Sequence, residues 1–339
     1  MTPVQDQHGR PLRSLRLSVT DRCNLRCSYC MPEERYTWLP KGDLLSFEEL
    51  ARVTDAFVAE GVDRVRITGG EPLLRQELPT LIELLRQREL RDLALTTNGV
   101  RLAPLAPALR AAGLDRVTVS LDTLDRARFQ AMTRRDALPQ VLAGIAAARE
   151  VFGELKLDCV VVRGRNDDEL LPLLDFAREQ GAELRFIEYM DVGGATHWTP
   201  ERVLSQAEIL ERIGAARGPA ESFEPRDAAP AERFRLPDGQ VFGVIASTTQ
   251  PFCARCDRSR LTADGHWFHC LYAPTGVDLL APLRAGEDVD ALRARIRAGW
   301  SARADRGAEE RRRLTRRRPL AVVEHLRQDP HLEMHTRGG

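Results

Sequence analysis

Lysine is almost missing from this 339-residue chain, and so is any net charge. Only Lys41 and Lys156 are lysines among 50 basic residues, and 50 acidic residues balance them. A protein that coats nucleic acid needs an excess of positive charge, so this balance argues against that class. The rarity of lysine also marks these two positions as places where a compact point charge could matter.

Long apolar runs are missing as well. No stretch of about 18 apolar residues occurs, and the N-terminal segment lacks the apolar core of a secretory signal, so we expect a cytoplasmic protein without a membrane span. Cysteines stay reduced in the cytosol, where clustered cysteines usually bind metal or do chemistry. Six of the seven cysteines fall in two tight groups. We expect the seventh, Cys159, to be a buried core residue because it lies in an apolar run.

The first 190 residues repeat a strand-then-helix rhythm. Short segments rich in Val, Ile and Leu predict strands at 15–20, 64–68, 92–97, 116–121, 155–162 and 183–189. Ser46 and Glu49 form a capping box that begins the first helix. Six β/α units in series predict an α/β fold, an incomplete (β/α)6 TIM-type barrel with parallel strands inside and helices outside. In such folds functional residues gather at the carboxyl ends of the strands.

The rhythm stops after about residue 195. Pro237-Asp238-Gly239 and Asp264-Gly265, each between apolar runs, predict two hairpins. Helices are expected near 284–299 and 318–327. We therefore divide the chain into a partial barrel, residues 1–195, and a C-terminal α+β region, residues 196–339, which closes the open side of the barrel.

The first cysteine group, Cys23-x3-Cys27-x2-Cys30, follows the first predicted strand. An iron–sulfur cube normally takes four cysteines, so three would leave one iron open, as a catalytic metal requires. The alternative is a zinc site completed by a distant histidine, although zinc motifs usually pair cysteines as C-x2-C. After the second predicted strand, Thr68-Gly-Gly-Glu-Pro72 could let a ligand approach the backbone closely.

The second cysteine group, Cys253-x2-Cys256 with Cys270, favours a structural zinc site when considered alone, with His266 or His269 as fourth ligand. Its context points elsewhere. Arg258 and Arg260 alternate on a predicted strand, so they share one face and could bind phosphate or a purine edge.

Longer segments carry a resemblance to known families. The first cysteine group resembles the signature of the radical S-adenosylmethionine superfamily. From Leu15 to Gly339 the chain resembles the GTP 3′,8-cyclase (molybdenum cofactor biosynthesis protein A) family. The matching segments are LRLSVTDRCNLRCSYCMP, RVRITGGEPLLR, LTTNG, RVTVSLDTLD, LRFIEYMDVGG, PFCARCDRSRLTADG and the terminal GG.

The resemblance implies two [4Fe-4S] clusters and S-adenosyl-L-methionine as cofactors. Two sets of cysteines would hold the clusters: Cys23, Cys27 and Cys30, and then Cys253, Cys256 and Cys270. Four residues resemble contacts to S-adenosylmethionine: Tyr29, Gly70, Ser120 and Met190. Seven residues resemble GTP contacts: Arg16, Arg66, Thr96, Lys156, Arg258, Ser259 and Arg260. The terminal pair, Gly338 and Gly339, would reach into the active site and take part in catalysis.

The implied reaction is a radical cyclisation by a lyase. A 5′-deoxyadenosyl radical would take the C3′ hydrogen of GTP, and the sugar radical would attack C8 of the guanine. The product would be (8S)-3′,8-cyclo-7,8-dihydroguanosine 5′-triphosphate, in the first step of molybdenum cofactor (molybdopterin) biosynthesis. The implied partners are an electron donor such as flavodoxin or ferredoxin and the downstream cyclic pyranopterin monophosphate synthase. The chain would be a monomer or homodimer.

Two other functions are weighed against this one. A radical S-adenosylmethionine peptide-modifying enzyme with an auxiliary cluster has a similar layout, but its C-terminal domain often carries more cysteines. A metal-stabilised nucleic-acid binder could use the arginine runs 311–313 and 316–318. Such runs are usually a solvated face, and the zero net charge argues against this class.

Charge on the predicted strands supports the nucleotide reading. Arg16, Arg66 and Lys156 alternate with apolar residues, and inward-facing charges would be costly unless an anion such as a triphosphate paired with them. Three positions depart from the family pattern, although none is a cysteine: Asp257, Ser259 and Arg337. The last makes the docking of the terminal glycines less certain.

Overall fold

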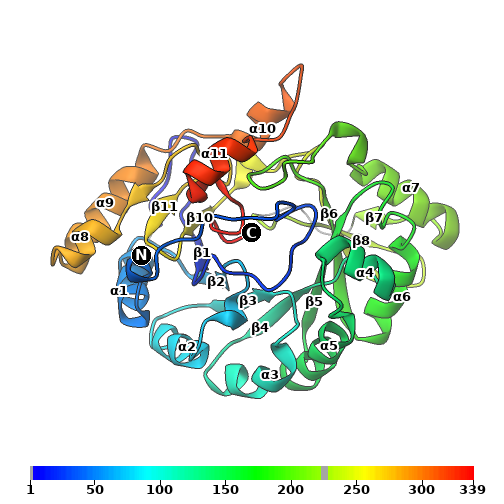
Figure 1. Ribbon diagram of the computed structural model, residues 1–339, viewed down its shortest axis with the longest axis horizontal. Helices are drawn as coiled ribbons and strands as arrows, with labels where there is room; N and C mark the ends of the chain where they lie inside the picture. Colours follow the sequence, from blue (N-terminus) through cyan, green and yellow to red (C-terminus); the bar gives the residue numbers. More distant parts are fainter. Residues whose placement is uncertain (1–2, 223–227) are drawn as a thin grey trace.

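Six parallel strands form the centre of the fold (Figure 1). The computed structural model describes residues 3–222 and 228–339. The central strands are hydrogen-bonded in sequence order: β1 (Ser14–Ser18), β2 (Arg64–Thr68), β3 (Asp92–Thr97), β4 (Arg116–Ser120), β5 (Leu155–Val161) and β6 (Ala182–Glu188). All six predicted strands are therefore confirmed, and their ends differ from the prediction by one or two residues at most.

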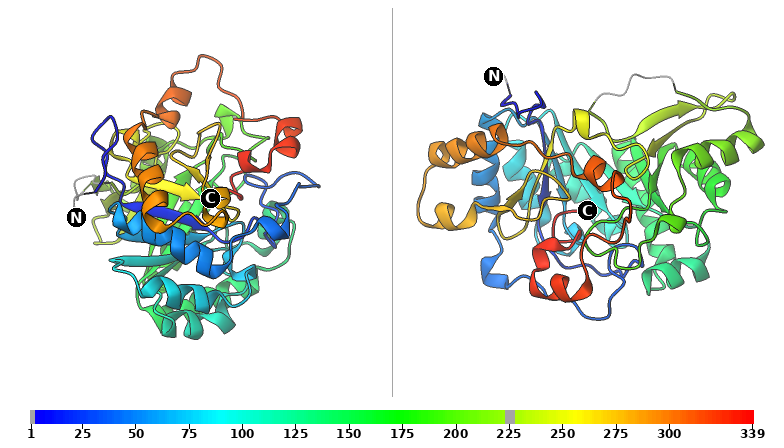
Figure 2. Two further views of the ribbon diagram at one scale, coloured as in Figure 1. Left: turned by 90° about the vertical axis from the view of Figure 1, so that its left-hand side faces the viewer. Right: turned by 90° about the horizontal axis from the view of Figure 1, so that it is seen from above.

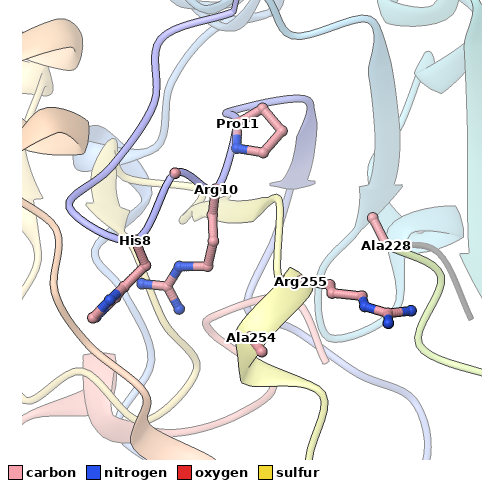
Figure 3. Close-up of a pocket in the computed structure, with 7 residues that line it drawn as sticks. His8, Arg10, Pro11, Ala228, Ala254 and Arg255 are labelled. Atoms are coloured by element: carbon pink, nitrogen blue, oxygen red, sulfur yellow. The ribbon is translucent and has the colours of Figure 1, made fainter.

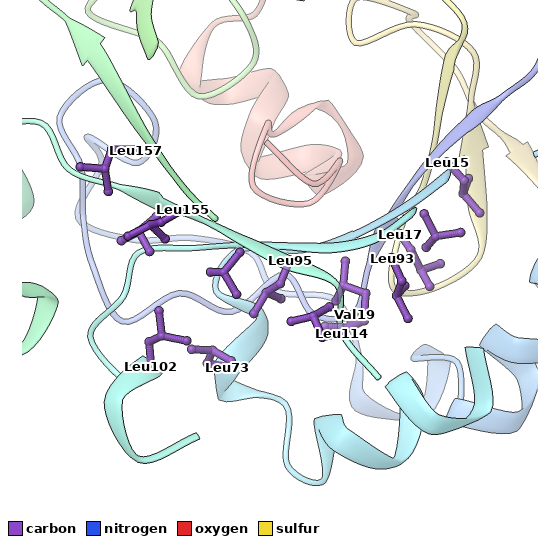
Figure 4. Packing of buried hydrophobic residues seen from close by; sticks show 14 of the residues in the cluster. Leu15, Leu17, Val19, Leu73, Leu93, Leu95, Leu102, Leu114, Leu155 and Leu157 are labelled. Atoms are coloured by element: carbon purple, nitrogen blue, oxygen red, sulfur yellow. The ribbon is translucent and has the colours of Figure 1, made fainter. Parts of the chain in front are cut away.

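Alternate residues of these strands face two different layers. Leu15, Leu17 and Leu95 have no exposed surface and belong to the main core between the sheet and the outer helices (Figure 4). The intervening positions, such as Arg16 and Ser18, face the interior of the curved sheet, which we call the lumen. The apolar residues thus build the barrel wall, and the polar ones line its inside.

Helices cover the outer face of the sheet (Figure 1). They are α1 (Phe47–Ala59), α2 (Leu78–Arg86), α3 (Leu102–Ala111), α4 (Arg126–Thr133), α5 (Leu138–Phe152), α6 (Leu170–Glu179) and α7 (Gln206–Arg217). The predicted capping box of α1 is confirmed: the Glu49 amide donates to Ser46 Oγ, and the Ser46 amide donates to the Glu49 carboxylate. Ser205 begins α7 in the same way.

The C-terminal region extends the same sheet at both edges. β9 (Val241–Ile245) pairs in parallel with β6, and β10 (Arg258–Leu261) pairs in parallel with β1. Antiparallel strands continue each side: β7 (Glu221–Ser222), β8 (Glu232–Arg235), β11 (His266–Phe268) and β12 (Val277–Asp278). Both predicted hairpins, β8–β9 and β10–β11, are confirmed. The fold is an α/β partial barrel with a mixed C-terminal region, and the division at residue 195 stays a prediction.

The C-terminal helices are shorter and more broken than expected. They are α8 (Leu280–Arg284), α9 (Val289–Ser301), α10 (Gly307–Arg312) and α11 (Val323–Gln328). The expected helix at 284–299 begins late because Gly286 adopts φ of 89° and Asp288 caps α9 through the Ala291 amide. Single 3-10 turns occur at η1 (Lys41–Asp43), η2 (Pro72–Leu74), η3 (Pro200–Arg202), η4 (Cys253–Arg255) and η5 (Pro330–Leu332).

The last residues run into the arc of strands (Figures 1 and 2). His335, Thr336 and Arg337 are at most 2% exposed, so this tail belongs to the interior of the barrel. No helix among residues 3–222 and 228–339 has the length and apolar character needed to cross a membrane.

Candidate active site

The first trio, Cys23, Cys27 and Cys30, lies on a loop that follows the carboxyl end of β1. Neighbouring backbone holds the loop in place. The Arg26 amide donates to the Thr133 carbonyl at 2.8 Å, at the end of α4. A Cβ on Gly70 would lie 2.4 Å from the Arg22 carbonyl oxygen, so only glycine allows the segment after β2 to approach this loop.

Glu71 ties the ends of two strands together beside the first trio. Its buried carboxylate accepts from Thr97 Oγ1 at 2.7 Å and from the Asn98 amide at 2.8 Å. Asn98 in turn donates to Asn24 Oδ1 at 2.8 Å, next to Cys23. The predicted GGEP segment thus positions the cysteine loop.

The three cysteines of the first trio are partly buried, and their thiols influence one another. Burial, followed by the charge of Glu71, raises the pKa of Cys23 to about 11. Burial, then Asp122 and the neighbouring thiols, raises the pKa of Cys27, and burial with Cys23 raises that of Cys30. A bound cation would stabilise the thiolate form in such surroundings, because it offsets the mutual repulsion and the loss of hydration. A cationic iron–sulfur centre fits this donor set.

The second trio, Cys253, Cys256 and Cys270, is assembled from separate elements. Amides of Ala308 and Glu309 in α10 donate to Cys253, and Cys270 Sγ lies 3.1 Å from where a Cβ on Gly307 would stand. Burial raises the pKa of Cys256, but the charges of Arg258 and Arg303 outweigh this effect and bring the pKa down to about 7. Arg258 Nη2 lies 3.5 Å from Cys256 Sγ. Basic side chains therefore act on Cys256, whereas burial, then the charge of Asp305, raises the pKa of Cys270.

A zinc site completed by a nearby histidine is not supported. His269 packs its ring against Trp267 at 4.2 Å, and His266 faces Asp264. Sulfur ligands of tetrahedral zinc lie about 3.8 Å apart, given a Zn–S distance of ~2.3 Å. Among the described residues, neither trio draws three ligand atoms within 4.8 Å of one another. A wider iron–sulfur cube suits both trios better.

Topology places the two trios at opposite ends of the lumen. Cys23 follows the carboxyl end of β1, whereas Cys256 precedes Arg258 at the amino end of β10. Because β10 lies beside β1 and runs parallel to it, these two cysteines lie at opposite ends of the sheet. β11 returns antiparallel to β10 and brings Cys270 back to the end of Cys256.

Three arginines line the wall between the trios. Arg16 stands in register with Arg66 on one side and with Arg260 on the other. Burial, then neighbouring arginine charges, lowers the pKa of Arg66 to about 9 and that of Arg260 to about 10. The pKa of Arg16 falls for the same reasons. This concentration of partly buried positive charge favours the binding of an anion.

Hydroxyl and further basic groups continue the same lining. Arg66 donates to Thr96 Oγ1 at 3.0 Å. Lys156 lies 3.8 Å from Glu183, and burial, then the charge of Arg185, lowers its pKa. Arg185 itself pairs with Asp158 at 3.1 Å. Sequence reasoning missed Arg185, although its place among apolar residues of a strand was the same signal that marked Arg66 and Lys156.

Ser259 stands apart from its neighbours Arg258 and Arg260. Its register partner on β1 is Leu15, which faces the outer core. Ser259 is completely buried, and its Oγ has no hydrogen-bond partner among the described residues. Alternation therefore turns its side chain away from the lumen and leaves only its main chain for a substrate contact.

The four residues expected to contact S-adenosylmethionine come from loops and strand ends near the first trio. Tyr29 donates to Asp122 Oδ2 at 2.6 Å. Ser120 ends β4, and Met190 follows β6 and packs in a small apolar cluster that also contacts Tyr29. Asp122 was not singled out from the sequence, although it follows a strand. Burial raises its pKa to about 6.

The terminal glycines enter the lumen and meet its arginines. Arg16 donates to a main-chain oxygen of Gly339, and Arg260 Nη1 donates to the Gly338 carbonyl at 3.1 Å. Gly338 has φ of 74°, and a Cβ there would lie 2.7 Å from Thr68 Cγ2. Both features require glycine. The arginines thus bind main-chain oxygens of the tail.

Arg337 docks the tail even though its charge departs from the family pattern. Its guanidinium lies 4.1 Å from the centre of the Phe268 ring, and Nη1 donates to the Leu271 carbonyl at 2.7 Å. The side chain therefore points towards the second trio, beside Cys270.

Polar atoms of the tail are buried without partners in the described residues: Glu333 Oε2, both ring nitrogens of His335, Thr336 Oγ1 and Arg337 Nη2. Buried polar groups are normally hydrogen-bonded. Two of these side chains contact aromatic rings: His335 packs against Tyr36 and Trp38, and Arg337 lies on Phe268.

A separate surface cavity of about 430 Å³ adjoins the second trio from outside (Figure 3). Arg10, one of its lining residues, donates to the Cys253 carbonyl at 3.0 Å. The other lining residues are His8, Gly9, Pro11, Ala228, Ala254 and Arg255. None of the residues predicted from the sequence lines it, so this cavity is not the candidate active site.

Two family models match successive parts of the chain. The model of the radical SAM superfamily matches residues 17–177. The model described as Molybdenum Cofactor Synthesis C matches residues 182–309. Together they cover both cysteine trios.

Curated relatives match over nearly the whole length. GTP 3′,8-cyclase 1 of Mycobacterium tuberculosis is 54% identical over 342 residues, which cover 99% of this chain and 95% of the relative. GTP 3′,8-cyclase 3 of Mycobacterium bovis is 53% identical over 344 residues, which cover 100% of this chain and 91% of the relative. GTP 3′,8-cyclase of Acidothermus cellulolyticus is 49% identical over 322 residues, which cover 91% of this chain and 89% of the relative.

A solved structure shares the fold. SuiB of Streptococcus suis, bound to S-adenosylmethionine, superposes with a TM-score of 0.58 over 85% of this chain and 69% of SuiB, at 15% identity. This level of identity shows the architecture alone.

Proposed function

Because the chain belongs to the GTP 3′,8-cyclase family of radical S-adenosylmethionine enzymes, we propose that it cyclises GTP in the lumen between its two cysteine trios. The product would be (8S)-3′,8-cyclo-7,8-dihydroguanosine 5′-triphosphate. Membership rests on 54% identity over 99% of the chain and on the two matching family models. The enzyme accordingly acts in molybdenum cofactor biosynthesis.

The position of three arginines supports this location for the reaction. Arg16, Arg66 and Arg260 form a partly buried basic wall between two cysteine trios that lie at opposite ends of one lumen. A triphosphate would neutralise this charge, and the guanine could then lie towards the second trio.

Each trio would hold one [4Fe-4S] cluster and leave one iron open. When bound, the first cluster and S-adenosylmethionine supply the radical that takes a hydrogen from GTP. Around them the chain's own groups position the reactants. Tyr29 is held by Asp122, and Gly70 lets the backbone of the GGEP segment approach the loop of the first trio. Ser120 and Met190 would complete the binding surface for S-adenosylmethionine.

The remaining predicted residues would bind GTP. Lys156 and Thr96 extend the basic wall, while Arg258 lies between the second trio and the lumen. Gly338 and Gly339 already present main-chain oxygens to the arginines. In the proposed complex these oxygens share the arginines with the substrate, which would place the tail next to the reacting sugar and exclude water.

Electrons would come from a small one-electron carrier such as flavodoxin or ferredoxin. The cyclised nucleotide would pass to a cyclic pyranopterin monophosphate synthase. A peptide-modifying function has only the distant likeness to SuiB in its favour, at 15% identity, and that likeness concerns the fold.

Anaerobic turnover tests the proposal. Protein reconstituted with iron and sulfide is given reductant, S-adenosylmethionine and GTP, and the nucleotides are identified by mass spectrometry. We expect 5′-deoxyadenosine and the cyclised nucleotide together. Consumption of S-adenosylmethionine with GTP unchanged would contradict the assignment. Arg313→Ala, at an exposed position, should behave like the wild type.

A further inference from the structure

A third group of metal-ligating side chains lies outside both cysteine trios. Asp264 is in the β10–β11 hairpin, His266 begins β11, and His331 lies in η5 at the root of the C-terminal tail. One ligand atom from each lies within 4.8 Å of the others, a feature that no other group of three among the described residues shares. The hairpin and the tail are 65 residues or more apart in sequence, so folding creates this group.

Both histidines of the group lie close to the same carboxylate oxygen, Asp264 Oδ2. His331 Nε2 lies 2.6 Å from Asp264 Oδ2, and His266 Nδ1 lies 3.4 Å from the same oxygen. The two imidazole rings face each other with centroids 4.2 Å apart. His266 Nδ1 is buried and has no hydrogen-bond partner within the described residues.

Outer contacts orient these ligands in the manner of a metal site. His331 Nδ1 lies 3.1 Å from Asp329 Oδ1, which would fix the tautomer that leaves Nε2 free to bind metal. Thr262 Oγ1 donates to Asp264 Oδ1 at 2.5 Å and holds the carboxylate in place. The side chains of His266 and His331 are 31% and 22% exposed, so an ion could enter from solvent.

We propose that Asp264, His266 and His331 bind a divalent transition metal of the zinc class. Two imidazoles and one carboxylate suit such an ion, and water can fill the remaining position. The ion would take the place of the proton between His331 and Asp264 and would give His266 Nδ1 a partner.

Metal binding at this point would fasten the tail to the hairpin. The His331 carbonyl accepts from Arg337 Nε at 2.5 Å, and Arg337 precedes the two glycines in the lumen. A metal held by His331 therefore fixes the root of the segment that places Gly338 and Gly339. The site is structural, and its occupancy can be measured without turnover.

Zinc retention provides the test. Anaerobically reconstituted protein with both trios filled by iron is mixed with Zn²⁺, passed through a desalting column and analysed for zinc and iron. We expect about one zinc per wild-type chain and less than about a tenth of that in His266→Gln and His331→Gln. The control His325→Gln changes an exposed histidine on α11 of the same tail and should keep its zinc.

Release of the tail provides a second readout. A serine carboxypeptidase should free the terminal glycines about tenfold more slowly from wild-type protein when zinc is present, with no such effect on His331→Gln. Unchanged iron content shows that each variant is folded. The proposal is overturned if wild-type protein retains no zinc, or if both histidine variants retain as much as His325→Gln.

Discussion

The two cysteine trios hold the same number of thiols, but one thiol of the second trio, Cys256, differs from the rest in its electrostatic surroundings. Acidic groups surround the first trio: Glu71 and Asp122 raise the pKa of its thiols beyond the effect of burial. In the second trio Arg258 and Arg303 lower the pKa of Cys256 to about 7, whereas burial, then the charge of Asp305, raises the pKa of Cys270. Negative surroundings favour the more oxidised, less negative form of a cluster, and positive surroundings favour the reduced form.

The trios also differ in how the chain builds them. The first lies within eight consecutive residues of one loop, so local sequence defines it. The second depends on η4, the end of β11 and the amides of α10, which meet only in the folded chain. The first trio can therefore form once the barrel has folded, whereas the second trio forms only when the C-terminal region has packed in place.

We expect the greatest loss of activity when a cysteine of either trio is replaced. The two replacements should affect different reactions, and identical effects would show that the trios are equivalent. We expect Cys23→Ser to abolish S-adenosylmethionine cleavage, and Cys270→Ser to retain cleavage but lose GTP conversion. Each should lower bound iron by about half, because each trio holds one cluster. Iron analysis and product quantification check this. Cys159→Ser, a buried cysteine outside both trios, should retain the iron content of the wild type.

Removal of a luminal arginine comes next in size. Arg16→Ala and Arg260→Ala each take away a partly buried charge from the proposed triphosphate site. We expect kcat/KM for GTP to fall by about 10²–10³, the scale of one buried charge-assisted contact. Uncoupled S-adenosylmethionine cleavage should persist. Equal loss of both reactions would place these arginines at the first trio instead of at the substrate.

A Cβ at the tail should have a smaller effect. Gly338→Ala adds a methyl group 2.7 Å from Thr68 at a positive φ, which strains the docked conformation by roughly 1–3 kcal/mol. We expect cyclisation to slow by about tenfold or more while both clusters stay bound. Rapid-quench measurement of the cyclised nucleotide, with iron analysis on the same sample, checks this. A variant as fast as the wild type would remove the terminal glycines from the active site.

The smallest effect concerns the acidic surroundings of the first trio. Burial raises the pKa of Asp122 to about 6 from an ordinary value of 3.8. Between these two values the folded chain binds more protons than the unfolded chain, so stability is lost as pH rises from about 4 to 6. The slope is at most about 1.4 kcal/mol per pH unit.

Urea unfolding of cluster-free protein at several pH values measures this slope. In Asp122→Asn the side chain no longer titrates, so the fall in midpoint across the window should become shallower. A variant with the same pH dependence as the wild type would show that Asp122 is not the buried carboxyl responsible.

The sequence predicts the barrel well because each element carries its own signal. Strands such as β2 and β5 alternate buried and less buried residues, and Ser46 and Glu49 cap α1 through local contacts. Arg16 and Arg66 stood out because a charge inside an apolar strand has few explanations, and the structure brings both into one lumen.

Residues defined by tertiary packing escaped prediction. α10 is only six residues long and begins at Gly307, so it has no helical periodicity of its own. Asp122 follows a strand without a motif that marks it, and its importance comes from burial beside Tyr29. The family resemblance predicts Ser259 as a GTP contact together with Arg258 and Arg260, but strand alternation turns its side chain outward.

Electron paramagnetic resonance on two triple variants tests the central claim most directly. With Cys23, Cys27 and Cys30 changed to serine, only the second cluster remains, and we expect GTP, but not S-adenosylmethionine, to change its spectrum. With Cys253, Cys256 and Cys270 changed, S-adenosylmethionine alone should change the spectrum of the first cluster. If GTP perturbed only the first cluster, or neither, the two trios would not divide cofactor and substrate between them.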